Sequence, residues 1–106
     1  MKAFYLNNML TIPFIIERSI RVPGLGLLVL PTAVPNWLAS YPIHTVMALC
    51  LHRLDQPPLP LVATIEEVEY DLQATTRGLL IESIPTDTML AGSWLVLGAI
   101  VTDKLV

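Results

Sequence analysis

Apolar and polar side chains alternate over a long stretch near the N-terminus, between residues 10 and 22, and this pattern constrains the fold most. Successive side chains of a β-strand point to opposite faces, so a period of two predicts a strand with one buried face. Arg18 is the one charged residue in the apolar series, and Pro13 removes a ladder donor, so we expect a sheet edge or a bulge here. The apolar series reads Leu10, Ile12, Phe14, Ile16, Ile20 and Val22.

Further strands are predicted at residues 27–30, 44–53, 61–72, 78–84 and 93–101, separated by proline and glycine turns. Residues 31–43 form a proline-rich insertion with a helical turn at 34–41. The alternation slips at Glu66–Glu67, as one bulged residue would cause. We therefore expect one all-β domain over residues 1–106, a small closed barrel of six to seven strands or a sandwich.

Composition limits the functions that this chain can have. Hydrophobic residues make up 54% and charged residues 14%, against about 25% charged in typical domains. This excess indicates a nearly all-buried scaffold, an adhesive apolar surface, or a partner that covers part of the surface. The net charge is −3 with six Lys and Arg, so nucleic-acid binding is disfavoured. The single cysteine, Cys50, excludes an internal disulfide. Asn7 and Asn8 interrupt any signal-like apolar run, and no run approaches the ~20 residues of a membrane span, so we expect a cytoplasmic protein.

Gly24 and Gly26 flank Leu25 in the stretch RVPGLGLLVLP. A phosphate-binding glycine pair opens a helix whose amide groups point at the anion. An apolar β run that ends in proline follows Gly26 instead, so we interpret the pair as a turn between two strands.

Two segments resemble the second domain of translation elongation factor Tu and its relatives, a six-stranded closed barrel. The first, FIIERSIRVPGLGLLVLP at residues 14–31, has an alternating apolar strand, a glycine-x-glycine turn and a valine-bearing strand. The second, GLLIESIPTDTMLAGSWL at residues 78–95, has a glycine, three aliphatic residues, an acidic loop and a glycine before the last strand. Between them, ATIEEVEY is similar to another strand of that family.

This resemblance implies a barrel with turn and corner glycines at Gly24, Gly26, Gly78 and Gly92. In the family the barrel lies beside a nucleotide-hydrolysing domain and helps to hold aminoacylated RNA. This chain has no phosphate-loop motif, its residues 32–41 depart from the family pattern, and Leu25 stands where the family carries arginine. The fold is therefore the main implication, and a translation accessory that contacts RNA is one alternative function.

Cys50 and His52 are two residues apart on one expected strand, about 7 Å, which is close enough to share a zinc ion. His44 has the same parity but lies about 26 Å away along the strand, and no Cys-x-x-Cys pair completes a ligand set. Leucines flank Cys50, and apolar burial makes a thiol inert. We expect no metal and no cofactor, with Cys50 and His52 as the only weak metal candidates.

The densest charge in the chain is the group Glu66, Glu67, Glu69 and Asp71. The last three alternate with apolar neighbours onto one face, which favours a solvated row that protects a strand edge. The functional interpretation is an acidic docking strip for a basic partner.

Two further sites are candidates. An inward-pointing Arg18 needs a carboxylate partner, and Glu82 is the candidate for a buried ion pair. Trp37 and Tyr41, in the proline-rich insertion, are expected to be exposed contact residues, and Trp94 is expected in the core.

We expect a protein that is not an enzyme and that acts as a protein-interaction or self-association module, as a homo-oligomer and without a membrane. The alternative is a small-molecule-binding or enzymatic barrel that uses the acidic strip, an Arg18-centred pocket, or Cys50 and His52.

Overall fold

A computed structural model describes residues 2–5, 12–71, 74–84 and 90–102, with residues 2–5, 70, 71 and 102 described by their backbone only. These residues form seven strands and one short helix. The elements are β1 (Lys2–Tyr5), β2 (Phe14–Val22), β3 (Gly26–Pro31), α1 (Asn36–Ser40), β4 (Val46–His52), β5 (Leu59–Asp71), β6 (Ala74–Ile81) and β7 (Trp94–Thr102). The all-β prediction is confirmed, although no strand was predicted at β1.

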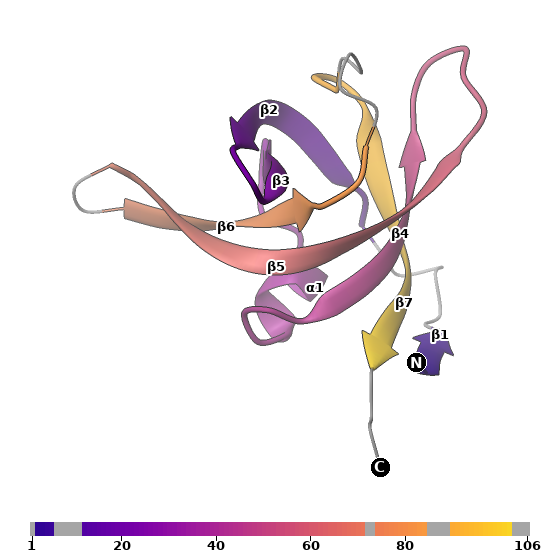
Figure 1. Cartoon of the computed structure of the whole chain (residues 1–106), viewed down its shortest axis with the longest axis horizontal. Helices are drawn as coiled ribbons and strands as arrows, with labels where there is room; N and C mark the ends of the chain where they lie inside the picture. Colours follow the sequence, from indigo (N-terminus) through magenta and orange to yellow (C-terminus); the bar gives the residue numbers. More distant parts are fainter. Residues whose placement is uncertain (1, 6–11, 72–73, 85–89, 103–106) are drawn as a thin grey trace.

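Six of the strands form a ring of antiparallel sheet. The order is β7-β2-β3-β6-β5-β4, and β4 pairs again with β7. β1 pairs with the C-terminal half of β7, from Ala99 to Thr102, and extends the sheet beyond the ring. β5 and β6 run on together past the other strands as a two-stranded arm (Figure 1).

Buried side chains from all six strands fill the interior of the ring. The strands β4 and β7 show the alternation that produces this, since every second residue from Met47 to Leu51 and from Leu95 to Ala99 is buried. The largest fully buried side chains are Phe14, Ile16, Leu38, Met47, Leu51, Ile65, Leu79, Ile81, Leu90, Leu95 and Leu97, with Val29. Apolar burial of this extent is the main stabilising contribution to such a domain.

Within the described residues the register shifts at three places, one of them between Ala48 and Leu49 in the pairing of β4 with β7, and these shifts decide which residues face inward. On β2 the shift lies between Ile16 and Arg18, so Glu17 is the extra residue. On β5 it lies between Glu69 and Asp71. The pairing of β5 with β6 is continuous from Ala63 to Glu69, so the bulge predicted at Glu66–Glu67 is wrong. The slip in the alternation there arises because the outward face of β5 carries both polar and apolar residues.

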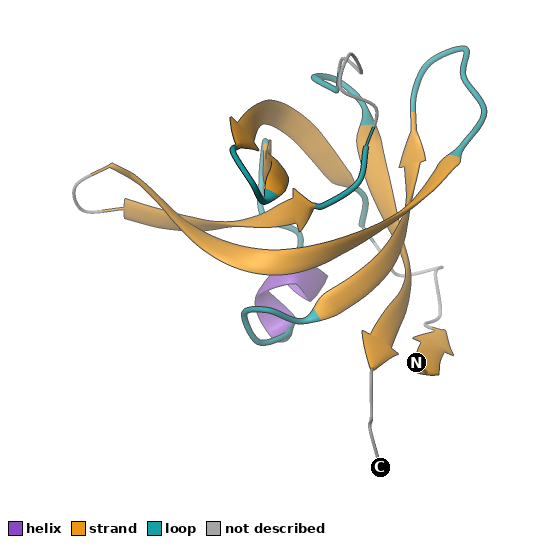
Figure 2. Cartoon of the chain, in the orientation of Figure 1, coloured by secondary structure: helices purple, strands orange, loops and turns teal. Residues whose placement is uncertain are grey.

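The proline-rich insertion contains α1, at the position where a helical turn was predicted (Figure 2). Pro35 is its N-cap with extended backbone, and Pro42 follows the C-cap Tyr41, so prolines limit the helix to five residues. Leu38 of α1 is fully buried in the core. The Arg77 guanidinium of β6 donates hydrogen bonds to the carbonyl oxygens of Leu38, at 3.1 Å, and of Tyr41, which are groups that a helix end leaves without an internal partner.

β3 and β6 approach each other closely at two glycines. A Cβ on Gly26 would lie 2.3 Å from the carbonyl oxygen of Ile81, and one on Gly78 would lie 2.7 Å from that of Val29. Gly26 also has φ of 138°, a conformation that side chains disfavour. Only glycine therefore permits this contact between the two hairpins.

Replacing Gly26 tests this close approach. We expect Gly26→Ala to lower the free energy of unfolding by about 3 kcal/mol, because the new Cβ meets backbone and not a movable side chain. Gly24→Ala is the matched control, since Gly24 has φ of 80° but nothing within 4 Å of an added Cβ, and its cost should be about 1 kcal/mol. Urea denaturation measures both; equal losses would contradict the interpretation.

Removing the Arg77 guanidinium tests how α1 is held. Arg77→Met keeps the aliphatic stem, and we expect it to lower the free energy of unfolding by about 2 kcal/mol, since two carbonyl groups lose a charged donor. Arg18→Met, at an exposed position, should change stability by less than about 0.5 kcal/mol. Urea denaturation with circular dichroism measures the difference between the two variants.

Candidate functional site

Because the interior is filled, the surfaces available for binding lie on the outside of the ring. Two of them carry apolar side chains on the solvent side of the sheet, where an antiparallel sheet is commonly polar. They lie on different strands and differ in charge.

The first surface, which we call the uncharged face, is the outer side of β4 with its neighbours β5 and β7. Cys50 pairs with Pro60 and Val96, Ala48 pairs with Val62, and His52 pairs with Trp94. Val62 is 51% exposed and Trp94 37% exposed. Among the described residues this face has no Lys, Arg, Asp or Glu; it consists of Val46, Ala48, Cys50, His52, Pro60, Val62, Trp94 and Val96.

Trp94 lies flat against His52 at the end of this face. The two rings are stacked with centroids 5.6 Å apart and an interplanar angle of 7°. His52 is therefore half-buried against an aromatic ring. Cys50, two residues before it on the same side of β4, is a free, half-buried thiol. Within the described residues, no three His, Cys, Asp or Glu side chains come together as a metal site requires.

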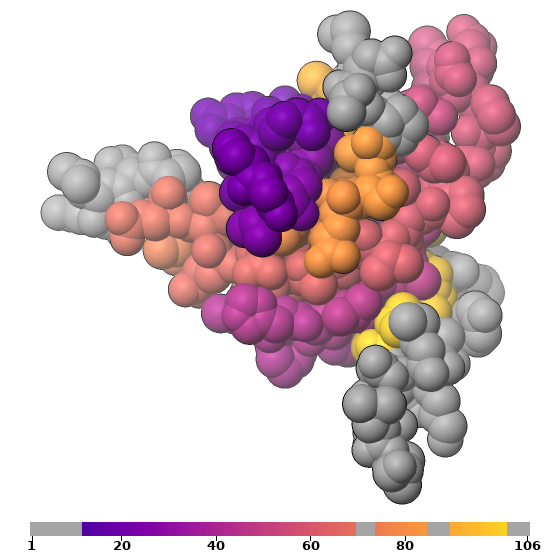
Figure 3. All heavy atoms as spheres, in the orientation of Figure 1, coloured from indigo at the N-terminus to yellow at the C-terminus, as the bar shows by residue number. Residues whose placement is uncertain are grey.

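The second surface is a hollow of about 520 Å³ on the outer side of β2, β3, β5 and β6, which we call the acidic groove. Leu28 and Leu80 are cross-strand partners at its floor, and each lies between two buried residues of its own strand. The apolar lining consists of Val22, Leu25, Leu28, Val68 and Leu80. In Figure 3 the β2–β3 end (indigo to purple) lies beside β5 and β6 (salmon and orange).

The polar lining of the acidic groove is Glu66, Glu67, Glu69 and His44. His44 has a φ of 73°, and its backbone N–H donates to the carbonyl oxygen of Ile65 at 2.7 Å. Its Nδ1 lies 3.2 Å from Oε1 of Glu66, and the Thr64 hydroxyl donates to Oε2 of the same carboxylate at 3.1 Å. Glu66 is thus held in place, whereas Glu67 and Glu69 are exposed.

The aromatic residues of the insertion pack partly against the core. Trp37 packs against the core, its ring centroid lies 6.5 Å from that of Phe14, and its indole N–H donates to the carbonyl oxygen of Ile12. Tyr41 also packs against the core. Trp37 and Tyr41 are thus half-buried and not the fully exposed residues that were expected, and their contact with a partner stays a prediction. The core position predicted for Trp94 is wrong, because this side chain is 37% exposed.

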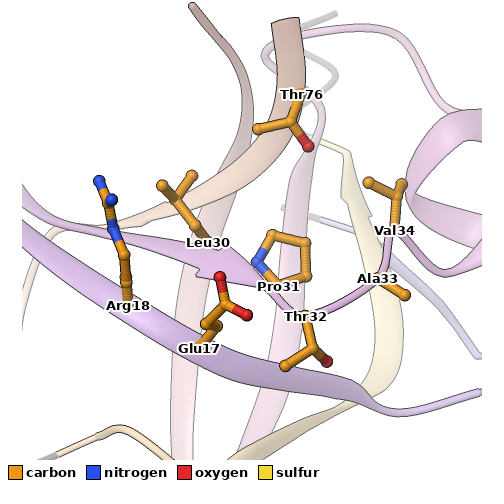
Figure 4. Close-up of a pocket in the computed structure, with 8 residues that line it drawn as sticks. All are labelled: Glu17, Arg18, Leu30, Pro31, Thr32, Ala33, Val34 and Thr76. Atoms are coloured by element: carbon orange, nitrogen blue, oxygen red, sulfur yellow. The ribbon is translucent and has the colours of Figure 1, made fainter. Parts of the chain in front are cut away.

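The buried ion pair between Arg18 and Glu82 is also wrong, because both residues are exposed. The extra residue Glu17 moves Arg18 off the inner face, and Figure 4 shows the two side chains rising from the same side of β2. They line a hollow of about 240 Å³ with Leu30, Pro31 and Thr76 among others. Glu82 instead borders the uncharged face, where it lines a hollow of about 390 Å³ with Ala48, Pro60 and Val62.

The remaining predicted residues fall as follows. Glu67 and Glu69 share one side of β5, opposite Val68, whereas the side chain of Asp71 lies outside the described residues. Gly24 lies in the turn between β2 and β3, Gly26 begins β3, Gly78 lies in β6, and Gly92 precedes β7. The Gly24–Leu25–Gly26 stretch joins two strands and opens no helix.

Sequence reasoning missed the floor of the acidic groove and its contact with His44. The signal for the floor was the unbroken apolar runs at residues 27–30 and 79–81, which place leucines on both faces of β3 and β6. No local signal marks the contact of His44 with Glu66, because it depends on the pairing of residues 22 positions apart.

No family model, curated protein or solved structure matches the chain. Among the helices that the described residues form, none has the length and apolar character needed to cross a membrane.

The two tryptophans allow a direct test of which one is structural. Trp37→Phe removes the indole N–H and part of the packing, and we expect it to lower the free energy of unfolding by about 2 kcal/mol. Trp94→Phe keeps a ring at an exposed position and should cost less than about 0.5 kcal/mol. Each variant retains one tryptophan, so its fluorescence can follow urea unfolding, and a larger loss for Trp94→Phe would contradict the assignment.

Proposed function

We propose that this chain is a cytoplasmic, non-catalytic interaction module that self-associates through the uncharged face. The observation that carries the proposal is that none of the described residues of that face, across three adjacent strands, is a Lys, Arg, Asp or Glu, with Val62 and Trp94 exposed at 51% and 37%. Interfaces between identical subunits are depleted of charge at their centre and enriched in aromatic residues.

A second copy is the occupant that best fits this face. In a two-fold symmetric contact the same residues meet their own copies, so a charged centre would place like charges together. The uncharged face has no such penalty. Glu82 lies at its border, where a rim residue can remain solvated.

The ring itself we propose to be a small barrel of the type found in the second domain of elongation factor Tu. The support is the order of the glycines: a glycine-x-glycine turn joins β2 to β3, Gly78 lies against β3, and Gly92 precedes the last strand. Leu25 in place of the family's arginine, together with the acidic groove beside it, disfavours the RNA-contacting alternative.

The small-molecule and enzymatic alternative has less support. The hollow that Arg18 lines has a volume of about 240 Å³, below the range of about 300–1,000 Å³ that ligand pockets occupy. The acidic groove, at about 520 Å³, is within that range, so volume disfavours only the Arg18-centred form of this alternative. The described residues fill the interior of the ring with fully buried side chains, which favours a binding site on an outer surface.

A charge at the centre of the uncharged face tests self-association. We expect the wild-type chain to have the mass of a dimer in light scattering at micromolar to millimolar concentrations, and Val62→Lys to have that of a monomer. The lysine would lie near Glu82, so the folded monomer bears no new like-charge repulsion. Leu54→Lys is the control, because Leu54 is 83% exposed in the β4–β5 connection, and it should remain dimeric. A monomeric wild type, or a dimeric Val62→Lys, would contradict the proposal.

A further inference from the structure

We propose that the acidic groove binds a basic segment of another protein, one that carries lysine or arginine beside apolar residues. The inference rests on the proposed role as an interaction module, but it does not depend on self-association. It is carried by an apolar floor, an acidic rim and the absence of basic side chains from the described lining of the groove.

The floor of the groove supplies the contact area. Ile20 pairs with Leu28, and Leu28 pairs with Leu80, so one row of apolar side chains crosses β2, β3 and β6 on the solvent side. Ile20 is 38% exposed, and Leu25 at the β2–β3 turn is 59% exposed. Covering such side chains removes apolar surface from water, which is the favourable term that gives most interfaces their affinity.

The rim determines the charge of the occupant. Glu66, Glu67 and Glu69 line the groove, and no described lining residue is a lysine or an arginine. Exposed ion pairs contribute only about 0–1 kcal/mol each to binding. The carboxylates would therefore affect the specificity and the association rate more than the affinity. Basic side chains flanking apolar anchors match both parts of the groove.

The three carboxylates have different roles. His44 Nδ1 and the Thr64 hydroxyl already contact Glu66, at 3.2 Å and 3.1 Å, so this carboxylate is fixed at the wall. The φ of 73° at His44 is an uncommon conformation for a residue with a side chain, and such strain gathers at binding sites. Glu67 and Glu69 are exposed and line the groove, although they lie on the side of β5 opposite Val68. Glu67 lies across from Arg77 of β6 and Glu69 across from Thr75, so Glu69 is the carboxylate without a basic cross-strand neighbour that would meet the partner's basic side chains.

Two other occupants fit less well. A second copy placed symmetrically in the groove would bring the three glutamates against their own copies, and like charges at an interface are unfavourable. A nucleic acid would present phosphates to the same carboxylates. The groove is therefore suited to a partner different from this chain and opposite in charge.

Labelled synthetic peptides test the proposal by fluorescence anisotropy on the full chain. The probe alternates leucine and lysine, and the two control peptides alternate leucine with glutamate and serine with lysine. We expect binding of the leucine–lysine peptide only, with affinity that falls as salt rises, because screening weakens exposed charge pairs. Equal binding of the leucine–glutamate peptide, or no binding of the leucine–lysine peptide, would overturn the proposal.

Variants then locate the site. The double variant Glu67→Gln, Glu69→Gln should bind the probe several-fold more weakly and with less dependence on salt. Leu25→Ser should weaken binding about tenfold, by loss of one apolar contact. Glu17→Gln is the matched control for an exposed carboxylate outside the groove, and it should bind as the wild type does. Circular dichroism establishes that each variant is folded.

The Val62→Lys variant separates this inference from self-association. Binding of the probe by a monomeric Val62→Lys supports the groove whether or not the wild type is a dimer. Loss of binding in Val62→Lys but not in Leu25→Ser would place the peptide on the uncharged face and overturn the assignment to the groove. Unchanged binding in the double glutamine variant would also overturn it.

Discussion

The close contact of β3 with β6 is the constraint on which the rest of the structure depends. These strands belong to different hairpins, β2–β3 and β5–β6, and only three residue pairs join them. Gly26 and Gly78 allow the backbones to meet, and Val29 then lies across from Leu79 and Leu27 across from Ile81 inside the ring. Because this contact brings large aliphatic side chains into a narrow ring, the interior is filled and binding is left to the outer surface.

The bulges determine which side chains reach that outer surface. After the extra residue Glu17, five consecutive residues of β2 from Glu17 to Arg21 are exposed. A bulged residue bends and twists its strand, and here the end of β2 leaves the core while still pairing with β3. Ile20 and Leu28 thereby form the start of the apolar row, and the β2–β3 turn places Leu25 at the edge of the acidic groove.

The positions of the strands can be predicted from the sequence better than which side chains of each strand face the interior. Period-two alternation and turn residues were enough to predict β2 to β7 and the short helix, because these signals are local. The inward position of Arg18 was wrong because a single extra residue reverses all later positions of a strand. The exposures of Trp37 and Trp94 differ from those expected for a similar reason: neighbours along the chain do not reveal whether α1 folds back onto Phe14. The contact of His44 with Glu66 requires the strand register, which no local pattern contains.

The two proposed roles of the molecule belong to outer surfaces that differ in charge, and β5 links these surfaces. Val62 belongs to the uncharged face and Val68 to the acidic groove, both on the outer side of β5 and six residues apart, which is about 20 Å along a strand. A second copy centred on Val62 would leave Val68 uncovered, although the two surfaces border each other where Val46 follows His44 by two residues. A dimer built in this way would present two acidic grooves, and a partner with two basic segments would bind the second groove at a raised effective concentration. Modest affinity at each groove would then suffice for a stable assembly. This agrees with exposed carboxylates, which contribute more to specificity than to affinity.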